Sequence, residues 1–442
     1  MTHSFLQVLL FLLAGIVLII LLTARWRVHP FFALLIACFV VGLGVQMPVA
    51  GILTAIKNGF GQIMQSLGLI IVLGTTLGVL LEHSGCTRVM ANFILKKTGE
   101  KKAPLAMSIT GFIVGLPVFC DSGYIVLSGL NQSLAKRTGI SVAIMAVSLA
   151  TGLYAVHCLL PPHPGAAAAA VTTGVDFGKL IAVGMAVAIP GMLAGHLWAR
   201  YAGKKIPHVA AEEEHIIGRA AAPHVFMAFL PVLVPVLLIA VNSFFALEKN
   251  GGHAVHKIFA VLGEPAIALA VGVLLVFTSM RSGMIQTISK QLQEGAEKAG
   301  GILVIIGAGG AFGAVLAATK IGEHFGRSLN LGSMGIFFPF LLTFILKTAQ
   351  GSSTVAIITA ASIVQPLLPA LGLNSENGKL LAVLAMGAGS MMISHANDAY
   401  FWVISKFSGL EMRPMLKVYS LATVWMGLVT LLVVYILSLL LL

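Results

Sequence analysis

Apolar stretches of helical length recur along the whole chain, and short polar segments rich in Lys and Arg separate them. A helix crosses the hydrocarbon core of a bilayer with about 20 apolar residues, so this pattern predicts an all-α polytopic membrane protein. Residues 49–60 are interpreted as an interfacial connection, and residues 281–298 as a basic loop. Uninterrupted crossings are expected at about residues 5–23, 30–47, 62–81, 178–200, 225–247, 258–280, 302–318 and 419–442.

Two further apolar stretches contain residues that a spanning helix avoids. The stretch at about 141–173 carries YAVHCLLPPHPG. Two prolines lie between His157 and His163, and a third follows His163 directly. Proline removes a backbone donor and blocks the helix, and the freed polar groups survive at membrane depth only beside protein or a water-filled cavity. The pattern therefore predicts a broken helix that borders a binding site.

A polar centre, GLPVFCDSG, interrupts the apolar segment at about 104–132. Two full crossings would need about 40 residues, and fewer are present between the basic segments on either side. The segment is therefore expected to be a re-entrant hairpin that enters from the cytoplasm.

The same landmarks recur in the same order in the second part of the chain. Residues 68–81 resemble residues 303–316, KTAQGSSTVA marks a second hairpin at about 335–370, and a second broken helix at about 379–405 places His395 where the first has His157. The two copies run in opposite directions, so the expected architecture is about ten transmembrane helices plus two re-entrant hairpins in an inverted-topology repeat. The halves are residues 1–206 and 223–442, joined by a hydrophilic cytoplasmic linker at 207–222.

Composition agrees with this architecture. Of 442 residues, 58% are hydrophobic and 10% are charged, which excludes a soluble globular protein. The net charge of +12 comes from Lys and Arg beside apolar segments. That is the positive-inside pattern rather than a nucleic-acid surface, and it places both termini outside. The four cysteines have no metal-ligand spacing and are expected to be packed thiols.

Both hairpin tips and both helix breaks are expected to meet near the midplane, where helix N-termini favour an anionic or zwitterionic solute. Hydroxyl, amide, imidazole and ammonium groups in these segments suit a small hydroxylated acid. The predicted substrate-binding residues are Ser122, His157, Lys347, Gln350, Ser352, Ser353, Thr354, His395 and Asn397.

Asp121, His157 and Asp398 are the candidates for proton coupling, because ionisable groups within apolar segments are costly and usually serve an ion pathway. Alternatives remain open for each type of residue. The carboxylates are caps or network members in one interpretation, and the histidines are structural. Lys347 pairs with a substrate carboxylate, with Asp121 or Asp398, or extends to the interface.

Enzymatic functions find no support in the sequence. The six-residue spacing of His157 and His163 matches no zinc motif, and the glycines at 307–313 follow no strand of a nucleotide-binding unit. Those glycines indicate close helix packing instead. No metal, cofactor or catalytic group is expected, and Glu82 and His83 are interpreted as exposed residues at a helix end.

GLPVFCDSG, HCLLPPHPG, KTAQGSSTVA and SHANDAYFW, in this order, resemble the gluconate permease family of bacterial proton symporters. The family is distantly similar to the ion transporter superfamily, in which paired hairpins carry SNT-type tips and an elevator motion in a dimer moves carboxylates. Cys120–Ser122 and Ser352–Thr354 stand at those tips here, and neither is SNT, which favours protons over sodium.

The resemblance implies import of gluconate or a related small hydroxy-carboxylate with protons, across a bacterial inner membrane, by a homodimer. Some members of the family carry glycerate or a small amino acid such as D-serine, so these substrates remain alternatives. A passive carboxylate channel or facilitator is a further alternative, because inverted repeats alone do not exclude it.

Overall fold

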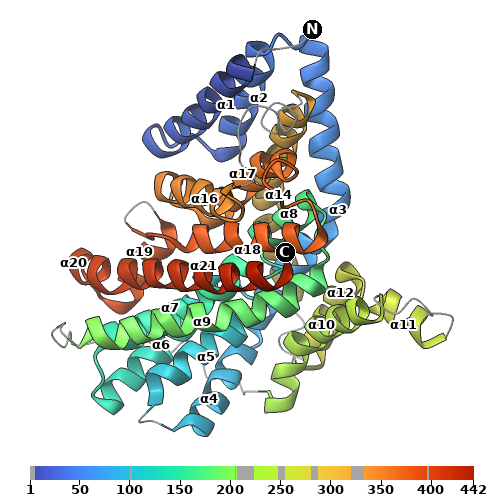
Figure 1. The fold of residues 1–442 in the computed structure, drawn as a ribbon. Helices are drawn as coiled ribbons and strands as arrows, with labels where there is room; N and C mark the ends of the chain where they lie inside the picture. Colours follow the sequence, from blue (N-terminus) through green and yellow to red (C-terminus); the bar gives the residue numbers. More distant parts are fainter. Residues whose placement is uncertain are drawn as a thin grey trace.

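The computed structural model describes residues 5–99, 102–204, 206, 223–246, 254–279, 287–319, 333–395 and 398–442. All regular elements in these ranges are helical (Figure 1). Five helical stretches in the described parts are long and apolar enough to cross a membrane: Val49–His83, Val142–Thr173, Phe177–Gly203, Ile288–Ala318 and Met412–Leu441. Shorter apolar helices accompany them, so the chain folds as an all-helical membrane protein.

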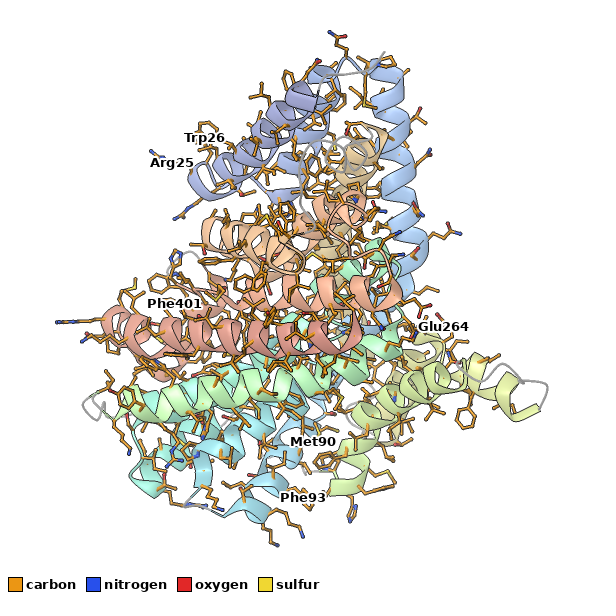
Figure 2. The ribbon with its side chains drawn as sticks, in the orientation of Figure 1. Arg25, Trp26, Met90, Phe93, Glu264 and Phe401 are labelled. Atoms are coloured by element: carbon orange, nitrogen blue, oxygen red, sulfur yellow. The ribbon has the colours of Figure 1, made fainter. Side chains whose placement is uncertain are left out.

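The first two helices form a pair at one end of the molecule. α1 (Phe5–Ile20) continues through a π-helical turn, η1 (Leu21–Arg25), and α2 (Pro30–Gly44) begins at a proline, whose fixed backbone suits a first helical position. Arg25 and Trp26 lie on the outer edge just after α1, and Trp26 is 61% exposed (Figure 2). An exposed Trp beside Arg at a helix end is typical of a membrane interface.

α3 (Val49–His83) is one continuous helix of 35 residues. The expectation of an interfacial connection at 49–60 was wrong, because no proline follows Pro48 in this stretch and Gly59 lets the helix pack closely on a neighbour. A helix of this length spans about 52 Å, which exceeds the hydrocarbon core of a bilayer. α3 therefore has to tilt strongly or extend beyond the membrane.

α14 (Ile288–Ala318) packs along α3 (Figure 1). It begins well before residue 302, so the expected basic loop was wrong for the part that the structure describes. A Cβ added at Gly59 would lie 2.4 Å from the Gly310 carbonyl oxygen. The glycines of this segment thus allow the two backbones to touch, as the packing interpretation predicted.

α4 (Cys86–Thr98), α5 (Ala103–Val114) and α6 (Cys120–Thr138) follow α3. α4 was not expected, because its Lys and Arg residues suggested a loop. Its Phe93 ring, labelled in Figure 2, meets the Phe229 ring edge-on with centroids 5.7 Å apart, and so joins α4 to α10. The chain turns between α5 and α6 at residues 115–119, an apolar segment that contains Pro117.

α7 (Val142–Leu159) is buried at every residue and forms the centre of the molecule. It ends where the prolines begin, and α8 (Pro164–Thr173) starts after a short non-helical segment that contains a cis Pro161–Pro162 bond. The alanine-rich α8 is buried along most of its length. α9 (Phe177–Gly203) then returns along α7.

The chain continues with α10 (Val225–Ala246), α11 (Ala254–Leu262) and α12 (Pro265–Ser279), which form a flank of the molecule (Figure 1). The expected single helix at 258–280 was wrong, because the chain breaks at Gly263 and Glu264 and restarts at a proline. A Cβ on Gly263 would lie 2.3 Å from the Asn242 side chain, so close packing on α10 requires glycine there.

The second half ends with α16 (Phe337–Gln350), α17 (Ser353–Val364), η4 (Gln365–Leu367), α18 (Glu376–Met391), α19 (Ala399–Ser408), α20 (Met412–Met415), η5 (Leu416–Ser420) and α21 (Leu421–Leu441). Between α18 and α19, Ile393 adopts a φ of 43°. A β-branched residue in the left-handed region is strained, and such strain concentrates at functional sites.

Helix contacts follow the same order in both halves. α5 packs on α7 and α7 on α9, while α16 packs on α18 and α18 on α21. The short helix α19 contacts α6 of the first half, and the short helix α8 contacts α17 of the second half. α9 and α21 lie side by side and close this central group (Figure 1).

Candidate substrate site

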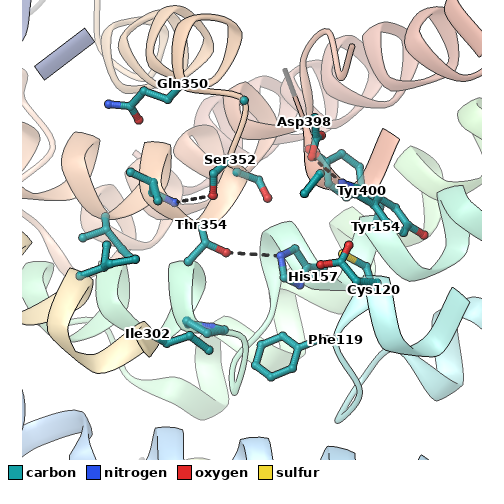
Figure 3. Close-up of a pocket in the computed structure, with 18 of the residues that line it drawn as sticks. Phe119, Cys120, Tyr154, His157, Ile302, Gln350, Ser352, Thr354, Asp398 and Tyr400 are labelled. Carbon is teal, nitrogen blue, oxygen red and sulfur yellow. Dashed lines mark hydrogen bonds between the residues drawn. The ribbon is translucent and has the colours of Figure 1, made fainter. Parts of the chain in front are cut away.

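A cavity of about 480 Å³ lies where α6, α8, α17 and α19 begin (Figure 3). Its lining includes Cys120, Pro164, Ser353 and Ala399, the first residues of these four helices. The first backbone N–H groups of a helix have no partner within it, and the helix dipole adds a partial positive charge. Four such ends around one cavity make it suitable for a negatively charged group.

Hydroxyl and amide side chains supply the polar part of the wall. Ser122, Ser353 and Thr354 line the cavity, and Ser352 caps α17 through its hydroxyl, which accepts a hydrogen bond from the Val355 amide at 3.3 Å. Gln350 also lines it, and in the part of the chain that the structure describes neither polar atom of its side chain has a partner. A hydroxylated solute can therefore find both donors and acceptors here.

His157 stands at the centre of the wall (Figure 3). Its Nε2 lies 3.4 Å from the Thr354 hydroxyl, which links α7 to the N-terminus of α17. Its Nδ1 is buried and has no partner among the described residues. The ring thus keeps one unused polar atom beside the cavity.

His163 has a different role from His157, although the rings lie only 4.8 Å apart. Its Nε2 donates to the Gly115 carbonyl oxygen at 2.6 Å. This bond ties the break between α7 and α8 to the end of α5. His163 therefore positions the wall and does not line the cavity.

Lys347 and Asp398 form a buried ion pair. The Lys347 side chain is 0% exposed, and its ammonium donates to Asp398 Oδ2 and to the Gly351 carbonyl oxygen, both at 2.6 Å. Asp398 also accepts from the Ser394 hydroxyl and from the Tyr400 amide. These bonds offset the cost of burying both charges and join the end of α16 to the start of α19.

Asp121 also lines the cavity and forms no ion pair within the described ranges, although Lys347 acts on it electrostatically over a longer distance. Its hydrogen-bond contact is with the neighbouring Cys120 thiol, at 3.7 Å between sulfur and oxygen. The two aspartates that the sequence singled out therefore differ in environment. Asp398 is held by three donors, whereas Asp121 keeps its capacity to bind a proton or a ligand.

Most of the predicted site residues meet in this cavity, but two described ones, Lys347 and His395, do not. Lys347 lies behind the wall, and His395 points its Nε2 to the Thr348 carbonyl oxygen at 3.3 Å. Asn397 lies outside the described residues. The predicted residues that line the cavity are Asp121, Ser122, His157, Gln350, Ser352, Ser353, Thr354 and Asp398.

Tyr154 and Tyr400 line the cavity although the sequence did not single them out. Their rings stack with centroids 5.7 Å apart, and their hydroxyls donate to the carbonyl oxygens of Ser390 and Ala150. The two rings thus form a rigid floor that joins the halves. Sequence spacing gives no signal for this pair, because the residues come from helices far apart in the chain.

Lys298 and Ile302 also line the cavity, from one face of α14. The assignment of a loop before residue 302 concealed Lys298, since a loop lysine is normally exposed. A helix that starts at Ile288 places Lys298 and Ile302 one turn apart on the same face. The helical spacing of Lys298 and Ile302 is the sequence signal that would have identified Lys298 as a lining residue.

Two solved transporter structures have a similar fold. The Alcanivorax borkumensis YdaH transporter matches with a TM-score of 0.65 and 14% identity, over 87% of this chain and 88% of that one. Neisseria gonorrhoeae MtrF, from a class of antimetabolite efflux pumps, matches with a TM-score of 0.60 and 16% identity, over 86% and 84%. The chain therefore has a membrane transporter fold.

The chain belongs to the GntP family of permeases, whose model matches residues 7–440. It is 34% identical to a gluconate permease of Pseudomonas aeruginosa over 97% of both chains. It is 31% identical to a high-affinity gluconate transporter of Escherichia coli, over 92% of this chain and 94% of that one. A D-serine transporter of Escherichia coli is also 31% identical, over 95% and 96%. The family consists of permeases, so the chain is a transporter and not an enzyme.

Proposed function

We propose that this permease is a secondary active transporter that imports gluconate or a related small hydroxy-carboxylate together with protons. The convergence of four helix N-termini on one cavity carries the proposal, because it favours a negatively charged group at that point. A volume of about 480 Å³ lies in the usual range for small-molecule sites.

The side chains of the wall narrow the substrate class. Ser122, Gln350 and Thr354 offer hydroxyl and amide groups, which suit a solute with several hydroxyls. Relatives named for gluconate support this choice. A relative named for D-serine makes a small amino acid the alternative, and glycerate is a third candidate of the same chemistry.

Asp121 is our candidate for the proton carrier, with His157 beside it. The Asp121 carboxylate lines the cavity and forms no direct ion pair in the described structure, so a proton is a suitable counter-charge when substrate binds. Asp398, the third candidate, is already neutralised by Lys347. We therefore assign Asp398 two roles: it positions the start of α19, and it acts electrostatically on Asp121.

We further propose an inverted-topology repeat with α5/α6 and α16/α17 as re-entrant hairpins. The parallel order of helix contacts in the two halves supports this arrangement. The same proposal includes a location in the bacterial inner membrane, both termini outside, and a homodimer. The hydrophilic linker at 207–222 lies outside the described residues.

Uptake into proteoliposomes tests the function. With an inward proton gradient, the purified protein should accumulate labelled gluconate above its outside concentration, and dissipating the gradient should abolish the excess. Equilibration without accumulation would contradict symport and indicate a facilitator. Unlabelled D-serine and glycerate as competitors distinguish the substrates: the true substrate suppresses uptake at the lowest concentration.

A further inference from the structure

Lys298 is the one Lys or Arg among the described residues that line the cavity. It lies on the face of α14 that carries Ile302 and Ile305, one and two turns further along. Its side chain is 37% exposed, in contrast to the fully buried Lys347. An anion that enters the cavity therefore meets the Lys298 side chain at the wall.

Lys347 cannot take that role without breaking existing bonds. Its ammonium donates to Asp398 and to the Gly351 carbonyl oxygen, and it does not line the cavity. Releasing it would leave Asp398 as a buried charge without its cation, which is strongly unfavourable. Because Lys347 is held by Asp398, Lys298 is the cation of the described cavity wall that can bind an anion.

Acidic residues hold Lys298 when no substrate is bound. Its ammonium lies 2.7 Å from Glu294 Oε1, and it also interacts electrostatically with Glu82 of α3, which lies near Ser122. Glu294 in turn contacts His83 Nε2 at 3.1 Å. Glu294 is 39% exposed, and ion pairs this exposed contribute little, so Lys298 can exchange Glu294 for another carboxylate at small cost.

We propose that Lys298 binds the carboxylate of the substrate and that Glu294 is its partner in the empty protein. The inference rests on the proposed function, since it takes the substrate to be a carboxylate, and it adds the residue that selects anions over uncharged polyols. A cation favours a full negative charge over an uncharged polyol more strongly than helix N-termini or hydroxyl groups do.

Calorimetric titration of the full-length protein in detergent tests the role of Lys298, with gluconate as the ligand and sorbitol as its uncharged counterpart. Lys298→Met should raise the Kd for gluconate about fivefold, the effect of one partly exposed ion pair. The matched control is Lys290→Met, which removes an exposed lysine from the same helix outside the cavity and should leave the Kd unchanged. The difference between the variants should shrink in high salt.

A second variant keeps the test decisive if Lys298→Met fails to fold. Glu294→Gln removes the competing carboxylate and should lower the Kd for gluconate about twofold. Equal Kd values for wild type, Lys298→Met and Lys290→Met would overturn the assignment, as would an unchanged Kd in Glu294→Gln. A wild-type protein that binds neither gluconate, glycerate nor D-serine would instead overturn the proposed function itself.

Discussion

The Lys347–Asp398 pair shows how one buried charge fixes the role of another. Both residues are candidates for substrate or proton binding when the sequence is considered alone, yet each is satisfied by the other. Asp398 is also the N-cap of α19, and Lys347 binds a carbonyl at the end of α16. The pair therefore positions two helix ends that border the cavity.

Breaking this pair should destabilise the protein. We expect Lys347→Met to lower stability by about 3–5 kcal/mol, because it leaves the Asp398 carboxylate buried without its cation. Thermal unfolding in detergent, followed by intrinsic fluorescence, measures the loss. The double variant Lys347→Met/Asp398→Asn should recover part of it, since no unpaired charge remains. Equal losses in the single and double variants would contradict the pairing argument.

Asp121 should behave differently from Asp398. Asp121→Asn should abolish accumulation of gluconate under a proton gradient while exchange of labelled for unlabelled gluconate continues, because only the carboxylate that binds the proton is lost. Proteoliposome uptake and counterflow measure the two activities. Glu297→Gln, which neutralises an exposed carboxylate of α14, is the control and should retain both. Normal gluconate accumulation in Asp121→Asn would show that Asp121 is not the proton carrier.

Close packing of α5 on α7 depends on glycine. A Cβ added at Gly152 would lie 2.1 Å from the Ser108 carbonyl oxygen and 2.9 Å from the Phe112 amide nitrogen, and neither backbone atom can rotate away. Gly152→Ala should therefore force the helices apart and cost about 1–3 kcal/mol. The thermal midpoint in detergent measures this loss.

The control for Gly152→Ala is Gly129→Ala in α6, where an added Cβ meets nothing within 4 Å. Alanine is the better helix former by about 1 kcal/mol, so this variant should be neutral or slightly stabilised. A similar loss in both variants would show that glycine flexibility, and not the close approach of α5 and α7, sets stability here.

Helix ends were predictable where proline or glycine determines them. The prolines after Leu159 mark the end of α7, and Pro30 marks the start of α2. Boundaries set by charge were not predictable. The lysines of α4 and the start of α14 suggested loops, whereas charged residues continue a helix readily when one face packs on a neighbour.

Site residues were predictable when they lie close to a break in the chain, as Asp121, His157 and Thr354 do. Contacts between distant elements were predictable at most as one of several alternatives, as Asp398 was for Lys347. The partner of Lys347 is 51 residues away on another element, and the stacked Tyr154 and Tyr400 come from opposite halves. Pairings of this kind depend on the packed structure, so the sequence left several partners open.

At the scale of the whole molecule, the two halves interlock around the cavity. α6 of the first half contacts α19 of the second, α17 of the second contacts α8 of the first, and the cavity wall takes residues from both. Lys179 at the start of α9 also pairs with Glu376 at the start of α18, at 2.5 Å. Neither half can form the site alone, so both have to be inserted before substrate can bind.

Insertion direction is set by the distribution of Lys and Arg, which leads to the last prediction. The basic end of α9 should face the cytoplasm and the lysine-free end of α21 should face outside. The four native cysteines are buried, and buried thiols react slowly, so a membrane-impermeant maleimide should report on introduced cysteines alone. In intact spheroplasts, Leu442→Cys should be labelled at once, whereas Lys204→Cys should react only after permeabilisation. The opposite pattern would invert the proposed orientation and with it the side from which substrate enters.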